Sequence, residues 1–133
     1  LPDLPLDIYL DEYKPLFETH GLKMSFLITP QTSENRIRLI AKESTAFLYV
    51  VSSFAITGSK SDIEDSQIDY FNYINNLELS VPKLIGFGIS NAETFSKACA
   101  YADGAIIGSA FIKSLKSSTN LSVDIKQFTN NIK

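Results

Sequence analysis

The stretches GFGISNAETF (residues 86–95) and DGAIIGSAF (residues 103–111) decide the fold expected for this chain. In each stretch, a short apolar run reaches glycine and is followed by a segment with helical periodicity. Glycine at such a junction permits a tight turn and leaves backbone N–H groups open at the positive end of a helix. Because only 6 glycines occur in 133 residues, their use at two successive junctions points to a ligand-binding edge.

Four short apolar runs predict strands at residues 24–29, 46–52, 83–88 and 104–109. The runs are continuous rather than alternating, which is typical of parallel strands covered on both faces. Helical patterns separate the runs, so the strands should be parallel and joined by right-handed crossovers. A doubly wound sheet and a (β/α) barrel both satisfy this alternation.

The segments around the strands carry helix signals of their own. Residues 6–20 are predicted to form a helix that Gly21 stops, with Pro15 bending it or marking its true start. The next helix should begin at Thr32 or Ser33. Its buried face is expected to comprise Ile37, Ile40 and Ala41. A later helix should turn inward the side chains of Ile68, Phe71, Ile74 and Leu77.

The helix after the third strand is predicted to start with a capping box formed by Ser90 and Glu93. Its buried stripe is expected to comprise Phe95, Ala98, Cys99 and Ala102. Cys99 would then be an inert core thiol. The tail, residues 111–133, is expected to hold a short apolar segment, a polar break and a last helix around residues 123–132.

The composition limits the possible functions. A net charge of −3 without a basic run argues against nucleic acid as a partner, and no apolar run is long enough to span a bilayer. A single cysteine excludes an internal disulfide and fits a cytoplasmic location. One histidine and one cysteine far apart offer no metal set. We therefore expect a soluble acidic domain.

The glycine turns have a functional and a structural interpretation. Backbone N–H groups near Gly88 and Gly108, with the Ser109 hydroxyl, could hold a phosphate without any lysine or arginine. Alternatively, the glycines only permit tight turns. Their recurrence favours phosphate. The polar segment 57–66 is longer than a structural turn needs and is interpreted as a lid over such a site.

The chain resembles the tryptophan synthase alpha chain family in ordered motifs along essentially its whole length. These are LPDLP (1–5), FLITPQTSENRI (26–37), YVVSSFAITG (49–58), GFGIS (86–90) and GAIIGSAF (104–111). The resemblance implies an α/β fold, namely the C-terminal half of a (β/α)8 TIM barrel with parallel strands 5–8 and flanking helices. Residues 1–133 would be a single partial domain without the N-terminal half-barrel.

The resemblance also implies a function, that of a lyase cleaving indole-3-glycerol phosphate to indole and glyceraldehyde-3-phosphate. The implied phosphate-binding residues are Gly58, Gly88, Gly108 and Ser109. The implied pocket residues are Pro2, Leu27, Tyr49, Thr57 and Phe87. No cofactor is implied in this chain, because pyridoxal phosphate (PLP) belongs to the partner beta chain of the alpha2-beta2 complex. Thr57 would lie in the mobile loop, where Ala55 replaces the family's usual glycine.

The acid and base of the family's reaction align with no residue of this chain. Asp3 is the best-placed local carboxylate, but its position favours a structural role. The isolated chain is therefore expected to be inactive, to bind phosphate weakly and to self-associate through its exposed strand edges and apolar inner face. The alternative is a complete flavodoxin-like phosphate-binding module without catalysis.

Overall fold

A computed structural model describes residues 4–51, 65–86, 88–116 and 118–132. Its centre is a four-stranded parallel sheet of strands β1 (Phe26–Ile28), β2 (Leu48–Val51), β3 (Lys83–Gly86) and β4 (Gly104–Ala105). The strands follow one another across the sheet in chain order, β1-β2-β3-β4. A doubly wound sheet reverses its strand order at a switch point, whereas a barrel continues in sequence. The described strands therefore have barrel topology, and the expected α/β fold is confirmed.

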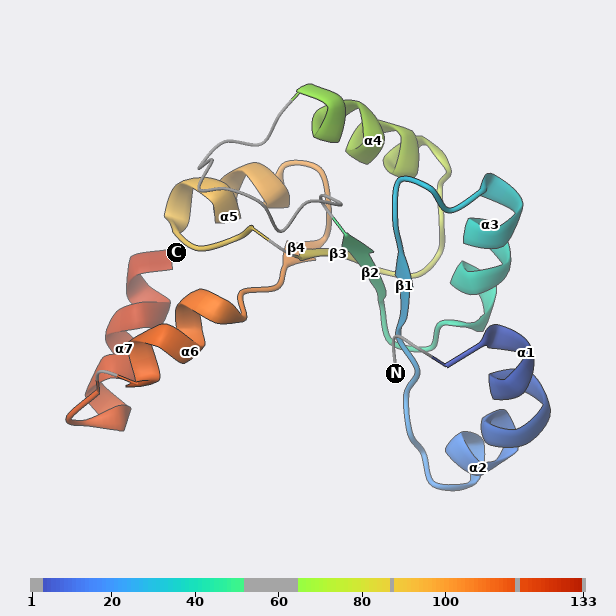
Figure 1. The fold of residues 1–133 in the computed structure, drawn as a ribbon, viewed down its shortest axis with the longest axis horizontal. Coiled ribbons are helices and arrows are strands. Elements are labelled where there is room, and N and C mark those ends of the chain that lie inside the picture. Colours follow the sequence, from blue (N-terminus) through green and yellow to red (C-terminus); the bar gives the residue numbers. More distant parts are fainter. Residues whose placement is uncertain (1–3, 52–64, 87, 117, 133) are drawn as a thin grey trace.

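Helices α3 (Glu34–Glu43), α4 (Asp65–Asn76) and α5 (Ala92–Cys99) form the crossovers between consecutive strands (Figure 1). The predicted inward residues of α3 are all buried, and Ser33 is its N-cap. Phe71 and Ile74 of α4 and Leu77 directly after it are buried as well, whereas Ile68 is only half-buried. These side chains share one hydrophobic cluster with Phe26, Ile28, Leu48, Val50 and Ile85 of the sheet.

The sheet is not covered equally on its two faces, which corrects the expectation of strands buried on both sides. Phe26, Ile28 and Leu48 lie in the core, whereas the intervening Leu27 and Tyr49 are only half-buried. Successive side chains of a strand point to opposite faces, so the helices cover one face and the other stays partly open. We call this second surface the inner face.

The segment before β1 consists of α1 (Leu6–Ile8), a π-helical turn η1 (Tyr9–Tyr13) and α2 (Lys14–Thr19). Proline lacks an amide hydrogen and its ring clashes with the carbonyl four residues earlier, so Pro15 cannot sit inside a regular α-helix. The chain accommodates it by widening one turn, where the Lys14 amide donates to the Tyr9 carbonyl. Pro15 thus both interrupts the helix and lies in the first turn of α2, as predicted.

Gly21 ends this segment with φ at +64°, in the left-handed region that glycine adopts without strain. The Leu22 amide donates to the Phe17 carbonyl at 2.8 Å, which is the long bond of a Schellman motif. Tyr9 then packs edge-on against Phe26 at 5.2 Å between ring centroids, which joins the segment to β1. Lys14 Nζ lies 2.7 Å from Glu43 Oε2 and joins α2 to α3.

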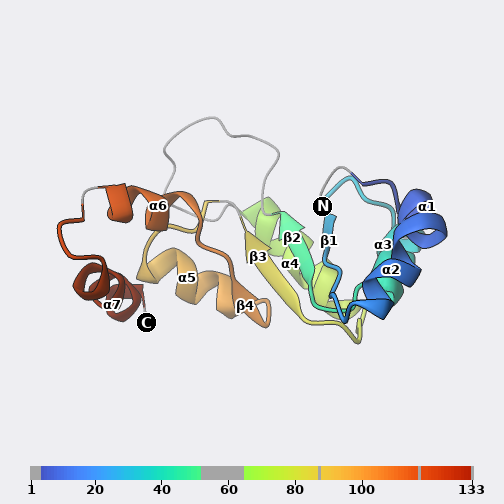
Figure 2. The ribbon, with the colours of Figure 1, turned by 90° about the horizontal axis from the view of Figure 1, so that it is seen from below.

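After β4 the chain forms α6 (Ser109–Lys116) and α7 (Leu121–Ile132), the expected tail helices. The rings of Phe111 and Phe128 pack at 5.3 Å between centroids and hold the two helices together. Figures 1 and 2 show that α6 and α7 lie at one end of the molecule, while α1 and α2 lie at the other. No helix in the described ranges is long and apolar enough to cross a membrane.

Candidate functional site at the strand ends

The turn that follows β3 is centred on Gly88. Its φ of +78° places it in the left-handed region, and a Cβ atom there would meet no atom within 4 Å. Glycine is therefore required by the backbone conformation and not by crowding. Ile89, the next residue, is only 6% exposed and anchors the turn in the core. The Gly88 backbone is consequently exposed to solvent, while the buried side chain of Ile89 holds the turn in place.

Helix α5 begins at a different cap from the one predicted. Its N-cap is Asn91, whose Oδ1 accepts the Thr94 amide at 2.9 Å, while Thr94 Oγ1 accepts the Asn91 amide at 3.2 Å. The expected capping box of Ser90 and Glu93 is wrong, because Asn91 can form the same reciprocal pair one residue later. Thr94 Oγ1 also accepts the Ser90 amide at 3.1 Å. The amides of Ser90, Asn91 and Thr94 are thus already occupied within the protein.

The turn that follows β4 leads directly into α6. The Ile106 amide donates to the Ile85 carbonyl at 2.8 Å, so pairing with β3 continues beyond the last strand residue. Gly108 is exposed, and its carbonyl accepts the Ile112 amide at 3.0 Å in the first turn of α6. Ser109 is the first residue of that helix and is exposed. The first amides of a helix have no partner within it and form a positive end.

The two turns lie at the same edge of the sheet. β3 and β4 are adjacent and parallel, with Leu84 opposite Gly104 and Ile85 opposite Ala105, so their carboxyl ends coincide. In the described part of the chain, the amides of Gly88 and Gly108 donate no backbone hydrogen bond. Three of the four predicted phosphate-binding residues are therefore brought to one edge, with Ser109 on the helix start. The fourth, Gly58, lies outside the described residues.

The predicted pocket residues that can be located lie on the inner face. Leu27 and Tyr49 are directly opposite each other in the β1–β2 register, and both are half-buried. Pro2, Thr57 and Phe87 lie outside the described residues, as does most of the segment interpreted as a lid. Leu27 and Tyr49 make part of the inner face apolar and aromatic. Such a surface is suited to binding a planar apolar group.

Two neighbours of these residues were missed by the sequence reasoning. Leu84 continues the row of Leu27 and Tyr49 across the sheet, and Gly86 lies at the end of the same strand. A Cβ atom on Gly86 would collide with the Tyr49 ring. The sequence did contain a signal for the Gly86 contact, since Gly86 interrupts the apolar run 83–88. A glycine inside a strand often marks the close approach of another group.

Asp103, which directly precedes β4, contacts the first residue of β3. The Lys83 amide donates to Asp103 Oδ2 at 2.8 Å, and Lys83 Nζ lies 3.5 Å from the same oxygen. The hydrogen bond from the Lys83 backbone is the main reason that the pKa of Asp103 lies below its ordinary value. These contacts join the start of β3 to the start of β4, at the edge opposite the glycine turns. Asp103 therefore has a structural role.

The cysteine prediction is wrong. Cys99 is exposed rather than buried in the core, although Ala98 beside it is fully buried. Cys99 is the last residue of α5, where the helical stripe ends and the neighbouring Ala100 is also exposed.

Asp3, the alternative catalytic carboxylate, lies outside the described residues.

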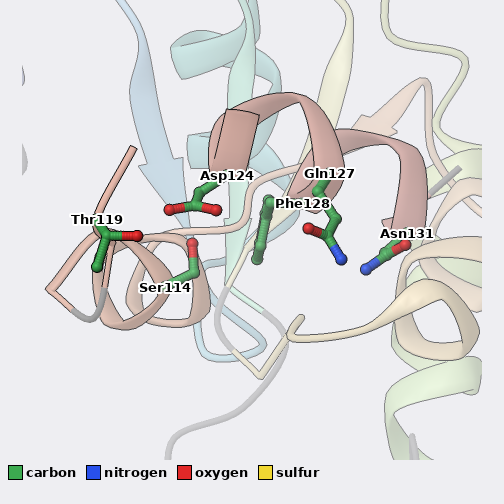
Figure 3. A pocket seen from close by; sticks show the side chains of 6 residues that line it. All are labelled: Ser114, Thr119, Asp124, Gln127, Phe128 and Asn131. Carbon is green, nitrogen blue, oxygen red and sulfur yellow. The ribbon is translucent and has the colours of Figure 1, made fainter. Parts of the chain in front are cut away.

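A polar hollow of about 310 Å³ lies between α6 and α7 (Figure 3). Its lining residues are Ser114, Thr119, Asp124, Gln127, Phe128 and Asn131. None of the strand-end residues lines it. Asp124 already accepts a hydrogen bond from Ser118 Oγ at 2.5 Å, which stabilises the connection between the helices. The hollow is thus a feature of local helix packing and is distinct from the strand-end site.

Sequential parallel strands with glycine turns at their carboxyl edge define this chain as part of a (β/α)8 barrel protein with a candidate anion site. The family model for the tryptophan synthase alpha chain matches residues 1–133, and the chain belongs to that family.

Curated relatives agree with this assignment. The tryptophan synthase alpha chain of Flavobacterium johnsoniae is 58% identical over 118 residues, covering 89% of this chain and 47% of the relative. That of Flavobacterium psychrophilum is 56% identical over 115 residues, covering 86% of this chain and 46% of the relative. The chain thus spans about half the length of the curated relatives it matches.

Solved structures give the same result for the fold. Tryptophan synthase subunit alpha from Campylobacter jejuni superposes with a TM-score of 0.75 at 28% identity, covering 96% of this chain and 50% of that one. The tryptophan synthase A-subunit from Pyrococcus furiosus superposes with a TM-score of 0.80 at 25% identity, covering 99% and 53%. The described fold therefore corresponds to about half of a TIM-barrel alpha subunit.

Proposed function

We propose that this chain supplies the phosphate and indole side of an alpha-chain active site. In this proposal the complete barrel cleaves indole-3-glycerol phosphate to indole and glyceraldehyde-3-phosphate, as a step of tryptophan biosynthesis. The single observation that carries the proposal is the convergence of Gly88 and Gly108–Ser109 at one sheet edge in a member of this family. The amides of these residues and the Ser109 hydroxyl bind the substrate phosphate.

The inner face provides the apolar part of the pocket. Leu27 and Tyr49 contact the indole ring from below, because they lie in adjacent positions of β1 and β2 under the glycine turns. Neutral backbone donors and a helix dipole suit a phosphate dianion, since they stabilise negative charge without a flexible cationic side chain. Gly58 and Thr57 complete the proposed substrate contacts from the segment between β2 and α4.

The chemical step needs an acid for the indole ring carbon and a base for the indole nitrogen and the glycerol hydroxyl. Asp103 lies at the opposite edge of the sheet, where it accepts the Lys83 amide, and it therefore supplies neither group. Both groups therefore come from the remaining half of the barrel in this proposal, and the 133-residue chain alone is inactive. The partner of the complete protein is the beta chain, which carries the PLP that consumes indole.

The test has a binding arm and an activity arm. Titration of the chain with glycerol 3-phosphate, followed by amide NMR, should shift the resonances of Gly88, Gly108 and Ser109 most. Co-expression with the segment of the Flavobacterium johnsoniae relative that this chain does not match should restore indole release. Indole release by the chain alone, or phosphate shifts confined to another edge of the sheet, would contradict the proposal.

Ser109→Ala serves as the matched probe, with Ser114→Ala as its control on the same helix. Removing the Ser109 hydroxyl should weaken phosphate binding roughly tenfold, because hydrogen bonds to a charged group contribute about 1.5–3 kcal/mol. Ser114→Ala should leave phosphate binding unchanged, since Ser114 lines the hollow between α6 and α7.

A further inference from the structure

One row of residues crosses all four strands of the sheet. The strand registers place Leu27, Tyr49, Leu84 and Gly104 opposite one another, from β1 to β4. The row therefore consists of three large side chains followed by a position without a side chain. Two of the three, Leu27 and Tyr49, are residues of the proposed indole pocket, whereas Leu84 and Gly104 have no role in the proposal so far.

Leu84 lies on the inner face because the residue that follows it is in the core. Ile85 is 1% exposed and belongs to the cluster on the helix-covered face, and Ala105, opposite it on β4, packs against the same cluster. Successive side chains of a strand point to opposite faces, so Leu84 and Gly104 share the inner face with Tyr49. Leu84 is half-buried there.

The Leu84 side chain lies in the space that Gly104 leaves empty. A Cβ atom on Gly104 would lie 2.9 Å from Leu84 Cδ2, which is closer than real contacts of this kind. The backbone of Gly104 does not itself require glycine, because among the described glycines only Gly21 and Gly88 have a positive φ. A strand glycine of this kind accommodates the close approach of another group, which here is the end of the leucine.

Tyr49 and Leu84 are opposite each other in register but lean in different directions. The Tyr49 ring covers Gly86, which lies nearer to the glycine turns along β3. Leu84 is the next inward-facing residue of β3 on the side away from those turns, and its end reaches toward β4. Leu84 therefore lies deeper than the tyrosine ring and bounds the inner face beneath it.

We propose that Leu84 is a specificity-determining residue at the floor of the proposed indole pocket, and that Gly104 positions it by letting its end lie over β4. A purely apolar floor selects a ring by its size, because each additional methyl group must find space. The inference deepens the proposed function and rests on it. It predicts that Leu84 limits the substituents that the six-membered part of the ring can carry.

The test uses the chain co-expressed with the unmatched segment of the Flavobacterium johnsoniae relative. Equilibrium dialysis gives the dissociation constants of indole, 5-methylindole and 6-methylindole. Leu84→Ala should strengthen binding of at least one methylindole relative to indole by roughly fourfold, the effect of burying one more methyl group. Gly104→Ala should have the opposite effect, because the new Cβ atom displaces Leu84 Cδ2 toward the pocket.

The double variant tests whether Gly104 acts through Leu84. When Leu84→Ala has removed the colliding Cδ2 atom, Gly104→Ala should no longer change the preference among the three indoles. Gly104→Ala should also leave the midpoint of urea unfolding nearly unchanged, because only the flexible end of a leucine must move. A loss of ring binding that merely followed a loss of stability would not show this separation.

Ile85→Val is the matched control, since it removes one methylene group from the opposite face of the same strand. It should lower stability and leave the preference among the indoles unchanged. A shift in preference as large as that of Leu84→Ala would overturn the inference, because the effect would then not depend on the inner face.

The remaining outcomes separate this inference from the proposed function. An assembly that releases no indole contradicts the proposed function, and the role of Leu84 falls with it. An active assembly in which Leu84→Ala leaves the preference unchanged overturns the role of Leu84 alone. An effect of Gly104→Ala that persists undiminished in the double variant overturns the positioning role of Gly104.

Discussion

The ring of Tyr49 lies over the backbone of Gly86, in the space that any side chain at residue 86 would fill. Tyr49 belongs to β2 and Gly86 ends β3, so the contact crosses between neighbouring strands. A Cβ atom on Gly86 would overlap Oη, Cζ and Cε1 of the tyrosine ring. The absence of a side chain at residue 86 therefore determines where the phenol of the inner face lies.

Gly86→Ala is expected to destabilise the chain by about 2 kcal/mol, since inserting one carbon into a packed contact typically costs about 1–3 kcal/mol. Urea unfolding followed by circular dichroism measures the change. Tyr49→Ala in the same chain should restore at least half of that loss, because it removes the colliding ring. A double-mutant cycle in which the two changes simply add would show that the ring and the glycine are not coupled.

Gly88 and Gly108 differ in backbone conformation although both have room for a side chain. Only Gly88 has a positive φ, at +78°, and neither position would place a Cβ atom within 4 Å of a neighbour. Gly88→Ala should therefore cost about 1–2 kcal/mol of stability through backbone strain. Gly108→Ala should change stability by less than about 0.5 kcal/mol. Equal losses in thermal or urea unfolding would contradict this difference.

Asn91 is expected to control the stability of α5. Asn91→Ala removes the acceptor for the Thr94 amide and should destabilise the chain by about 1 kcal/mol, the usual cost of losing an N-cap. Ser90→Ala is the matched control, because the Ser90 backbone and not its hydroxyl donates to Thr94. The prediction fails in urea unfolding if Ser90→Ala costs as much as Asn91→Ala.

Asp103 should make stability depend on pH in the acidic range. Its carboxylate accepts the Lys83 amide, and its pKa in the folded chain is lowered from 3.8. A lowered pKa stabilises the fold above the unfolded value, and this contribution is lost as pH falls through the folded value. Asp103→Asn should reduce stability by less than about 1 kcal/mol at neutral pH, because the carboxylate is partly exposed and screened by solvent.

The measurement is urea unfolding of both proteins from pH 7 to pH 2. The difference between the wild type and Asp103→Asn should persist down to about pH 4 and shrink below it, where the wild-type carboxylate becomes protonated. A difference that grows as the pH falls would have the wrong sign for a carboxylate that is stabilised in its charged form.

Local patterns in the sequence predicted the elements well. The four strands, the buried residues of α3 and α4, the role of Pro15 and the stop at Gly21 all depend on neighbours within a few residues. The cap of α5 was misplaced by one residue. Asn91, Ser90 and Thr94 are all able to form caps, and only the backbone angles of the turn select among them. The burial of Cys99 was predicted wrongly, because the spacing of apolar residues along α5 does not show which of them a neighbouring element covers.

The sequence by itself determined the alternation of strands and helices, the glycine turns and the family, because short-range periodicity and ordered motifs are properties of the chain. Tertiary structure alone decided the sequential strand order, the shared edge of Gly88 and Gly108, and the contact of Tyr49 with Gly86. It also decided that Leu27 and Tyr49 on the inner face stay half-buried. These features depend on which distant segments become neighbours, and that choice is made by packing of the whole chain.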